Sequence, residues 1–557
     1  MKRTISYIVF SFFSSLLFGQ SLLQNINTTP DSDANSRPNR WVSLNENHVI
    51  FAAILSGNNS TYYPYITNTD NYQTQLLDSF TVVSNLISFN GKVFFGGCDI
   101  SLENPCLELY CTDGTIGEVA LFKDLTASGI SSSPNDFLVA DDMFFFSADG
   151  SNTGRELWCS DGTPENTKLI SNIMPGIGSG FQGEAVLLDN VVYFAALSPS
   201  SGIEPWRSDG TEEGTFKLAE INPGIASSMP TSFTASNGYI YFVAEDDNFG
   251  RELRRYDPLS DTLITIVQPG GPDVPGDPRF LENSDDRLFF TSRSPDSLTI
   301  GLWVIDQDED PQYLGNQTGT PRSIIAFGDG EVLYTSFRPE IGSELYRSDG
   351  TVEGTQLVKD IFEGPGNGVF GGFGSNPEPF LVLGDSLLFF QGNDGSNNGD
   401  ELFISDGTAQ GTFQIGESWP GPEDGNPERF FIHNNHIFFQ AQGPNTGFEP
   451  FAMPLDFLST TFIPELSKAP FVISPPYPSP LIRSEEIKVD IKFEEPSRLF
   501  AQVYNQMGQT VTPVLDLGFL PEGNQTVRIP QDISSPGTYI LLLVHDGGKA
   551  AFRIIVQ

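Results

Sequence analysis

Short runs of β-branched and aromatic residues, each preceded by two turn-forming residues, recur along most of the chain. Asn90-Gly91 precedes the run KVFF, Asp141-Asp142 precedes MFFF, and Asn237-Gly238 precedes YIYF. Two turn residues before a strand-forming run are typical of a β-hairpin. Nine such signals occur, from Glu46-Asn47, which is the weakest, to Asn434-Asn435. The pattern therefore predicts an all-β chain made of repeated hairpins.

An eight-residue motif follows each hairpin signal and divides the chain into repeats. Its full form is Glu, Leu or Pro, an aromatic residue, any residue, Ser or Thr, and then Asp-Gly-Thr. Clear copies begin at Glu108, Glu156, Glu204, Glu344 and Glu401, and degenerate copies begin at Tyr63, Glu252, Gly301 and Glu449. Successive copies are 45, 48, 48, 48, 49, 43, 57 and 48 residues apart, measured at the third position. A period near 48 residues indicates a repeat architecture.

Each repeat is expected to hold four short antiparallel strands. The Asp-Gly-Thr segment supplies a tight turn, in which Asp accepts from N–H groups two residues on and Gly adopts a positive φ, and a fourth strand follows. A lone four-stranded sheet cannot bury both faces, whereas radial stacking against equal neighbours does so. Residues 41–466 are therefore predicted to form a β-propeller of nine blades, or of eight if the first repeat is incomplete. Residues 20–40 are predicted to be a linker ahead of it.

The motif copies, above all ELWCSDGT at Glu156 and ELYRSDGT at Glu344, resemble the ELWxxDGT repeat family of secreted Bacteroidetes proteins. The resemblance covers residues 41–466. The copies at Glu252, Gly301 and Glu449 depart from the family pattern because they lack Asp-Gly-Thr. The family implies a fold and an exported location, but it carries little established biochemistry, so no activity follows from it.

The N-terminus has the pattern of an export signal. Met1-Lys2-Arg3 and the apolar run that ends at Phe18 are typical of a secretory signal peptide, predicted here to span residues 1–19. The run is too short to span a membrane comfortably, and no other stretch resembles a transmembrane helix. We therefore do not expect an integral membrane protein.

The C-terminus is predicted to be a separate domain. A Pro-rich linker at residues 467–480 precedes residues 481–557, whose short alternating strands predict a small β-sandwich. Pro478-Ser479-Pro480 and the segment from Val503 to Gln509 resemble the type A sorting domain of type IX secretion, although the family's usual residue between the two prolines is Asn. The resemblance implies that the outer-membrane export machinery binds this domain and often removes it. After crossing the periplasm, the body would be secreted or held on the outer cell surface.

The charge and the histidine content argue against some functions. Asp and Glu number 71 against 29 Lys and Arg, a formal net charge of −42 that repels a nucleic-acid backbone. Only four His residues occur, which argues against a His-dependent hydrolase. His433 and His436 flank a two-residue turn. They are either metal ligands or ordinary residues of a hairpin. The motif Glu and aromatic residue recur at a fixed phase, so we interpret them as packing between blades rather than as a ligand site.

Calcium is the one cofactor for which the sequence offers candidates. The loops before three motif copies hold Asp149 and Asn152, Asp246 and Asp247, and Asp394 and Asn397. These oxygen-bearing residues stand in loops that contain glycine, and they either bind Ca²⁺ or act as ordinary turn residues.

Export permits disulfides among the four cysteines. Cys98 ends one strand-like run and Cys106 opens the next, so the two either form a disulfide across the intervening loop or remain free thiols. Cys111 and Cys159 occupy the same position in adjacent repeats, which is too far apart for a bond. We expect them to pack as small hydrophobic residues.

These features favour a secreted or cell-surface protein that is not an enzyme and serves recognition, adhesion or scaffolding, with a glycan or another surface protein as its ligand. The alternative is a propeller-type enzyme that degrades a polysaccharide with acidic residues. Because strands alternate in direction, the hairpin and Asp-Gly-Thr turns should share one end of the propeller and the links between blades the other. The links vary most, above all the long one from Gly364 to Pro379, so the ligand is expected at the link end.

Overall fold

The computed structural model describes the chain with gaps, and all structural statements refer to the described residues. These are residues 21–23, 25–26, 35–55, 61–102, 107–126, 129–247, 250–266, 276–295, 299–307, 309–315, 319–328, 330–369, 380–384, 386–396, 398–444, 446–455, 471–473, 487–493, 497–505, 515–521, 523–529, 537–545 and 548–556. All regular structure within them is β-strand, which confirms the predicted fold class.

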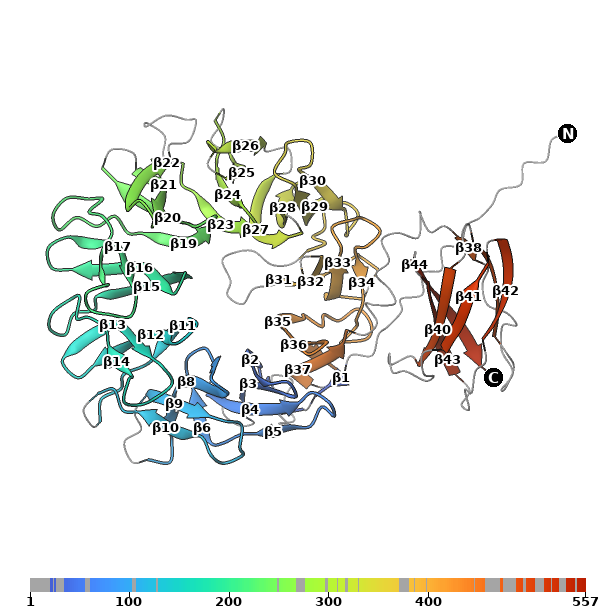
Figure 1. Cartoon of the computed structure of the whole chain (residues 1–557), viewed down its shortest axis with the longest axis horizontal. Coiled ribbons are helices and arrows are strands. Elements are labelled where there is room, and N and C mark those ends of the chain that lie inside the picture. The colour runs from blue at the N-terminus through green and yellow to red at the C-terminus, as the bar shows by residue number, and fades with distance from the viewer. Residues whose placement is uncertain are drawn as a thin grey trace. The chain divides into compact units, whose positions relative to one another are not determined.

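Nine antiparallel sheets follow one another along residues 21–455. Figure 1 shows them arranged radially, with strands such as β11 (Asn135–Val139) and β19 (Thr231–Ser236) innermost and β14 (Lys168–Leu169) and β22 (Thr262–Ile266) further from the axis. Eight of the sheets, blades 1 to 8, consist of consecutive strands, and blade 9 combines three consecutive strands with one from the N-terminal region. The described part of the chain therefore forms a propeller of nine blades, and the alternative of eight is not supported.

The innermost strands are β2 (Asn39–Asn45), β6 and β7 (Phe80–Val82 and Ile87–Phe89), β11 (Asn135–Val139), β15 (Phe181–Leu188), β19 (Thr231–Ser236), β23 (Arg279–Ser284), β27 (Thr320–Phe327), β31 (Phe380–Leu383) and β35 (Glu428–His433). The second strands are β3 (His48–Ile54), β8 (Lys92–Asp99), β12 (Phe144–Gly150), β16 (Val191–Ser198), β20 (Tyr239–Asp246), β24 (Arg287–Arg293), β28 (Glu331–Arg338), β32 (Leu387–Gly392) and β36 (His436–Gly443). The third strands, which carry the motif copies, are β4 (Tyr62–Asn68), β9 (Glu108–Thr112), β13 (Thr153–Ser160), β17 (Gly202–Ser208), β21 (Gly250–Asp257), β25 (Ile300–Asp306), β29 (Gly342–Ser348), β33 (Glu401–Ser405) and β37 (Thr446–Pro454). The outermost strands are β5 (Thr74–Leu76), β10 (Ala120–Lys123), β14 (Lys168–Leu169), β18 (Phe216–Lys217), β22 (Thr262–Ile266), β26 (Gln312–Gly315), β30 (Gln356–Lys359), β34 (Phe413–Gln414) and, in blade 9, β1 (Ser21–Leu22).

Blade 9 closes the ring with residues from the N-terminal region. β1 pairs with β37, and Leu23 N donates to Pro450 O at 2.9 Å. Further along, Ser36 N donates to Phe448 O at 2.9 Å. The stretch 20–40, predicted to be a linker, thus contributes a blade strand. The sequence pattern did not show this because a two-residue strand has no alternation to detect.

The core of the propeller lies between neighbouring sheets. Phe94 and Leu109 of blade 2 pack with Phe144 and Phe146 of blade 3 in one buried cluster. Phe145, between the last two in β12, belongs instead to the cluster shared with blade 4. Because neighbours cover both faces of a second strand, its apolar run is continuous rather than alternating.

The two ends of the propeller differ as predicted. Asp141 N donates to Asn190 Oδ1 at 3.0 Å, which joins the hairpin turns of blades 3 and 4. Arg287, beside the hairpin turn of blade 6, donates to Gly330 O at 3.1 Å in the next hairpin turn and to Asp349 O at 2.8 Å in the next Asp-Gly-Thr turn. Both kinds of turn therefore share one end, the turn end, and the links and the loops before the motif copies lie at the opposite link end.

The C-terminal unit is a small β-sandwich, as predicted. Its sheets have the orders β38-β39-β42 and β41-β40-β43-β44. The strands are β38 (Phe471–Ile473), β39 (Ile487–Phe493), β40 (Ser497–Asn505), β41 (Leu515–Leu520), β42 (Gly523–Ile529), β43 (Gly537–His545) and β44 (Gly548–Val556). Ile487 and Val489 of one sheet share a buried cluster with Leu541 and Leu543 of the other. Its first described strand, β38, lies inside residues 467–480, which were predicted to be a linker. The prolines that suggested a linker come after this strand, from Pro475 onwards.

Candidate functional site

The motif Glu of seven blades holds the link to the next blade. These buried residues are Glu108, Glu156, Glu204, Glu252, Glu344, Glu401 and Glu449. In blade 7 the Glu344 carboxylate accepts from Ile361 N at 2.9 Å, from Phe362 N at 3.3 Å and from Gly368 N at 2.9 Å. Since a buried N–H group without a partner costs free energy, the carboxylate stabilises the link that it binds.

The same contact closes the ring between blades 9 and 1. Glu449 accepts from Ile26 N at 2.9 Å and from Ser36 Oγ at 2.8 Å. The N-terminal stretch therefore takes the place that an ordinary link occupies in the other blades.

Burial changes the titration of these carboxyl groups. It raises the pKa of Glu156, Glu252 and Glu344 to about 7, outweighing the backbone N–H donors that favour the charged form. A pKa near 7 suits a general acid, but these three residues are at most 3% exposed and lie in three different blades. Their burial and separation favour a structural role.

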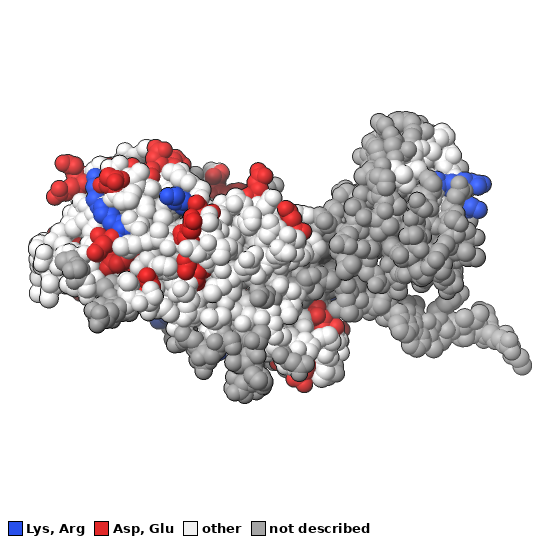
Figure 2. Space-filling model, turned by 90° about the horizontal axis from the view of Figure 1, so that it is seen from below, with Lys and Arg blue, Asp and Glu red and all other residues white. Residues whose placement is uncertain are grey.

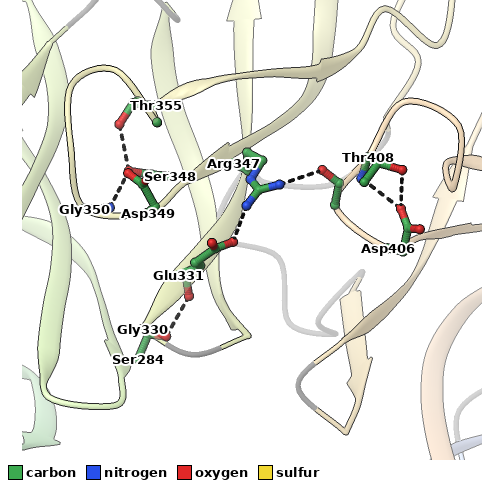
Figure 3. Close-up of polar contacts among 12 residues, drawn as sticks. Ser284, Gly330, Glu331, Arg347, Ser348, Asp349, Gly350, Thr355, Asp406 and Thr408 are labelled. Carbon is green, nitrogen blue, oxygen red and sulfur yellow. Dashed lines mark hydrogen bonds and ion pairs between the residues drawn. The ribbon is translucent and has the colours of Figure 1, made fainter. Parts of the chain in front are cut away.

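The Asp-Gly-Thr turns are closed by their own hydrogen bonds. In blade 7, Asp349 Oδ1 accepts from Thr351 N at 2.9 Å and from Thr351 Oγ1 at 2.7 Å. Ser348 Oγ lies 2.7 Å from Thr355 Oγ1 (Figure 3), and Gly350 has a φ of 83°. The Asp-to-Thr bonds recur in blades 3, 4 and 8. The predicted turn geometry is confirmed, and these carboxylates serve the scaffold.

An arginine joins the turn end of blade 7 to blade 8. Figure 3 shows Arg347 between Glu331 of its own blade and the neighbouring turn that holds Asp406. Its Nη2 lies 2.6 Å from Glu331 Oε2, and its Nη1 donates to Gly407 O at 3.4 Å. Arg347 thus links blade 7 to blade 8 at the turn end, and its guanidinium is used by these two contacts.

The motif aromatic residues pack between blades, as predicted: Trp158 of blade 3 shares a buried cluster with residues of blade 2, and Tyr346 of blade 7 shares one with residues of blade 6. The Trp158 ring lies 6.3 Å from the Phe146 ring, and Trp158 Nε1 donates to Ala148 O at 3.1 Å. Tyr346 stacks on Tyr334 at 5.6 Å. These rings belong to the core and are not a ligand platform.

The calcium candidates lie in three separate blades and do not converge. Asp149 and Asn152 belong to blade 3, Asp246 and Asp247 to blade 5, and Asp394 to blade 8, whereas Asn397 lies outside the described residues. Asp149 Oδ2 is 3.3 Å from Arg155 Nη2, and Asp246 forms an ion pair with Arg254. A guanidinium already neutralises these two carboxylates, which favours the turn interpretation there. Within the described ranges, no three His, Cys, Asp or Glu side chains are grouped to hold a metal. Calcium binding stays a prediction.

The histidine pair is part of a hairpin. His433 pairs with His436 across the turn of blade 9. His433 Nδ1 lies 2.7 Å from Ser43 Oγ, and its Nε2 lies 3.0 Å from Glu46 O. Both ring nitrogens of His433 thus bind blade 1, in agreement with the hairpin interpretation.

The described cysteines are buried. Cys111 and Cys159 are free thiols in two different apolar clusters, which confirms the prediction that they pack as small hydrophobic residues. Cys98 is buried at the end of β8. Cys106 lies outside the described residues, so the disulfide between the two stays a prediction.

The innermost strands carry a β-bulge that the sequence analysis did not predict. In blade 3, Asp136 and Phe137 of β11 lie opposite the single residue Phe146 of β12, and Asp136 has a φ of 53°. The equivalent left-handed residues, called bulge residues below, are Arg40, Asp136, Glu184, Ser232, Phe280, Ser323 and Arg429. A left-handed conformation costs about 1–2 kcal/mol for a residue with a side chain. Such strain and such bulges concentrate at functional sites.

The bulge residues belong to the innermost strands, which surround the axis of the ring (Figure 1). They occur in the first half of these strands, on the side of the links. Their backbone conformation is alike, but their side chains are cationic, anionic, hydroxylic or aromatic. The scaffold positions vary less: the first motif position is Glu in seven of the nine copies, and Asp-Gly-Thr is complete in five. We call the ring of bulge positions the inner rim. Because its side chains vary, the inner rim is the candidate binding site.

Some bulge side chains contact the next blade. Glu184 accepts from Ser232 N, and Arg40 donates to Val82 O at 3.2 Å and to Val83 O at 3.3 Å. These side chains therefore bridge neighbouring innermost strands at the link end.

A sequence signal for these bulges exists. A proline stands two residues before six of the seven bulge residues: Pro38, Pro134, Pro230, Pro278, Pro321 and Pro427. In five of these copies the residue directly before the proline is also left-handed: Arg37, Ser133, Met229, Asp277 and Asn426. The recurrence of proline at the blade period could have located the inner rim, but proline alone indicates only a break before a strand.

No helix that could cross a membrane occurs in the portion of the chain that the structure describes.

No family model matches the chain, and no curated protein matches it. Similar solved structures include PorZ, described as an essential bacterial surface component of the type IX secretion system of Porphyromonas gingivalis, with 12% identity over 93% of this chain and 75% of that chain and a TM-score of 0.34. Another is the β-propeller domain of the Trilobed protease from Pyrococcus furiosus, with 12% identity over 68% of this chain and 97% of that chain and a TM-score of 0.35. A third is dipeptidyl peptidase 4 of Porphyromonas gingivalis, with 11% identity over 56% of this chain and 51% of that chain and a TM-score of 0.38. Matches at this level carry no information about activity or partners.

Proposed function

We propose that this protein is an exported, non-catalytic propeller that recognises a ligand, a glycan or another surface protein, at the link end. The observation that supports this most is the difference between the repeated polar residues of the scaffold and the bulge residues. The repeated Glu and Asp residues form hydrogen bonds of the scaffold, whereas the bulge residues include arginines, acids, serines and a phenylalanine. A uniform frame with a variable rim suits binding, because ligand contacts on rigid scaffolds concentrate at irregular positions.

We further propose that the C-terminal sandwich is the sorting domain that directs the chain through type IX secretion to the outer surface. Support comes from the resemblance of its sequence segments and from its folding as a sandwich with a core of its own. A separately folded tail can be bound, and removed, without disturbing the propeller.

The alternative is an enzyme that degrades a polysaccharide, and one observation favours it. Asp136 and Glu184 are the two acids among the bulge residues, and they lie in neighbouring blades. Paired carboxylates are what glycoside hydrolysis requires. However, Asp136 Oδ2 already accepts from Ser147 Oγ at 2.7 Å, and Glu184 accepts from Ser232 N, so both carboxylates hold structural bonds.

A polysaccharide array read for both binding and turnover tests the proposal. We expect binding of at least one glycan without release of shorter products. Turnover that disappears in both Asp136→Asn and Glu184→Gln would show instead that the protein is an enzyme. Binding that survives removal of the bulge side chains would place the ligand elsewhere.

A further inference from the structure

Two arginines occupy equivalent bulge positions in neighbouring blades at the point of ring closure. Arg429 lies in β35 of blade 9 and Arg40 in β2 of blade 1, with φ values of 60° and 56°. The two strands lie side by side, because His433 Nδ1 is 2.7 Å from Ser43 Oγ. His433 comes four residues after Arg429, and Ser43 comes three residues after Arg40. The two guanidinium groups therefore share one level of the inner rim.

Among the ion pairs of the described residues, Arg40 appears in none, and Arg429 appears in one long pair, with Glu428. Arg429 Nε is 3.9 Å from Glu428 Oε1, which is beyond hydrogen-bonding distance, and this Nε is buried without a hydrogen-bond partner in the described structure. The Glu428 carboxylate accepts instead from Gln440 Nε2. Arg40 donates to the neutral carbonyls of blade 2 and lies over the Tyr62 ring at 5.0 Å. Two positive charges thus stand near one carboxylate, which does not hydrogen-bond to Arg429 Nε.

The electrostatic cost of this pair appears in the titration of Arg40. Burial lowers the pKa of Arg40, the Tyr62 hydroxyl raises it, and the charge of Arg429 lowers it again. A like charge nearby disfavours the charged form of a group. An anion between them would remove that repulsion.

The fold itself does not require arginine at these positions. The same left-handed bulge is made by Ser232 in blade 5, by Phe280 in blade 6 and by Ser323 in blade 7. The chain carries a net charge of −42, and Figure 2 shows Asp and Glu spread over the visible face of the propeller with Lys and Arg in only a few places. A concentration of positive charge at two adjacent positions of an acidic protein therefore points to a ligand rather than to the scaffold.

We propose that Arg40 and Arg429 form an oxyanion-binding site on the inner rim, which recognises the carboxylate or sulfate group of an acidic ligand such as an anionic polysaccharide. This inference rests on the proposed recognition function and names its ligand chemistry. A guanidinium presents a planar fork of N–H donors that matches the geometry of a carboxylate or sulfate. The acidic surface repels polyanions elsewhere, so one acid group would be held at this site and the rest of the ligand would extend over the link end.

Anion titration of the full-length protein tests the site. The probes are sodium glucuronate for the carboxylate source, sodium sulfate for the sulfate source and glucose as the neutral control, with heat of binding measured at constant ionic strength. We expect saturable binding of glucuronate, of sulfate or of both, and none of glucose. Binding of only one of the two anions identifies the source.

The variant Arg429→Gln should weaken anion binding by roughly tenfold or more, the loss expected for a charged hydrogen bond. It should fold normally because other blades tolerate Ser or Phe at this position, and a thermal melt checks this. Arg40→Gln is the second variant, should Arg429→Gln be unstable. The matched control is Arg279→Gln: Arg279 is exposed on β23, pairs with Asp277 at 2.7 Å and is not a bulge residue. It should leave binding unchanged.

The outcomes separate this inference from the proposed function. Absence of saturable anion binding, or equal binding by wild type and folded Arg429→Gln, would overturn the oxyanion site while leaving recognition of a neutral glycan intact. Anion binding that depends on Arg429, together with cleavage of an acidic polysaccharide, would support the site and refute the non-catalytic function.

Discussion

The buried carboxyl of Glu344 should make the free energy of unfolding depend on pH, and the sign of that dependence tests the role of burial. Two effects on its pKa oppose each other. Three backbone N–H groups at 2.9–3.3 Å favour the charged carboxylate, whereas complete burial of the side chain disfavours it. The pKa of about 7 means that burial wins. The variant Glu344→Gln removes the titration but keeps the shape.

The sign follows from proton linkage. The folded protein binds the Glu344 proton more tightly than the unfolded chain, whose pKa is 4.5. The resulting stability is complete below pH 4.5 and is lost as the pH rises through 7. Since each pKa unit corresponds to 1.36 kcal/mol, the loss is about 3 kcal/mol at most. Relative to Glu344→Gln, the wild type should therefore become less stable between pH 4.5 and pH 8, by about 2–3 kcal/mol.

Urea denaturation of both proteins at pH 4, 5.5, 7 and 8.5, followed by tryptophan fluorescence, measures the difference in free energy of unfolding. Comparison with the variant cancels the other titrating groups. Glu340→Gln, whose side chain is 71% exposed, controls for the loss of one surface charge and should show no such trend. If the wild type instead gains stability over Glu344→Gln as the pH rises, the N–H groups dominate and the reasoning about burial is wrong.

Three further predictions concern the turns, the loops and the tail. Asp349→Ala should lower the free energy of unfolding by about 0.5–1.5 kcal/mol because Thr351 N and Oγ1 lose their acceptor at an exposed turn. Asp142→Ala at an exposed hairpin position should have little effect in the same urea titration. If Asp394 and its neighbours bind calcium, millimolar Ca²⁺ should raise the melting temperature beyond the effect of NaCl at equal ionic strength; equal shifts would favour the turn interpretation. Deletion of residues 472–557 should leave the chain in the periplasm, as cell fractionation would show, and normal surface export of the truncated chain would contradict the sorting assignment.

Much of the fold could be predicted because its signals are local. The Asp-Gly-Thr turn depends on contacts two to seven residues apart, such as Asp349 with Thr351 and Ser348 with Thr355, so the motif carries its own geometry. The blade count followed from the hairpin signals and motif copies, which occur once per blade. The burial of the motif Glu was expected, but its partners were not, since they lie in the link to the following blade.

The candidate site could not be predicted in the same way. A bulge residue is defined by its register against the neighbouring strand, and proline two residues earlier shows only that the strand begins there. For the calcium candidates, in contrast, the local sequence suggested ligands that the structure shows in ion pairs. Asp149 and Asp246 have the composition of ligand loops, but arginines of the following strands pair with both.

The sequence by itself determined the strand content, the repeat of nine units and the turn geometry of this protein, because each depends on residues close together in the chain. Only the tertiary structure decided which distant residues meet. Ring closure brings Ser36 to Glu449, 413 residues away, and sets Arg40 beside Arg429. These contacts arise from the closing of nine blades around one axis, and no periodicity along the chain specifies which side chains become neighbours at the point of closure.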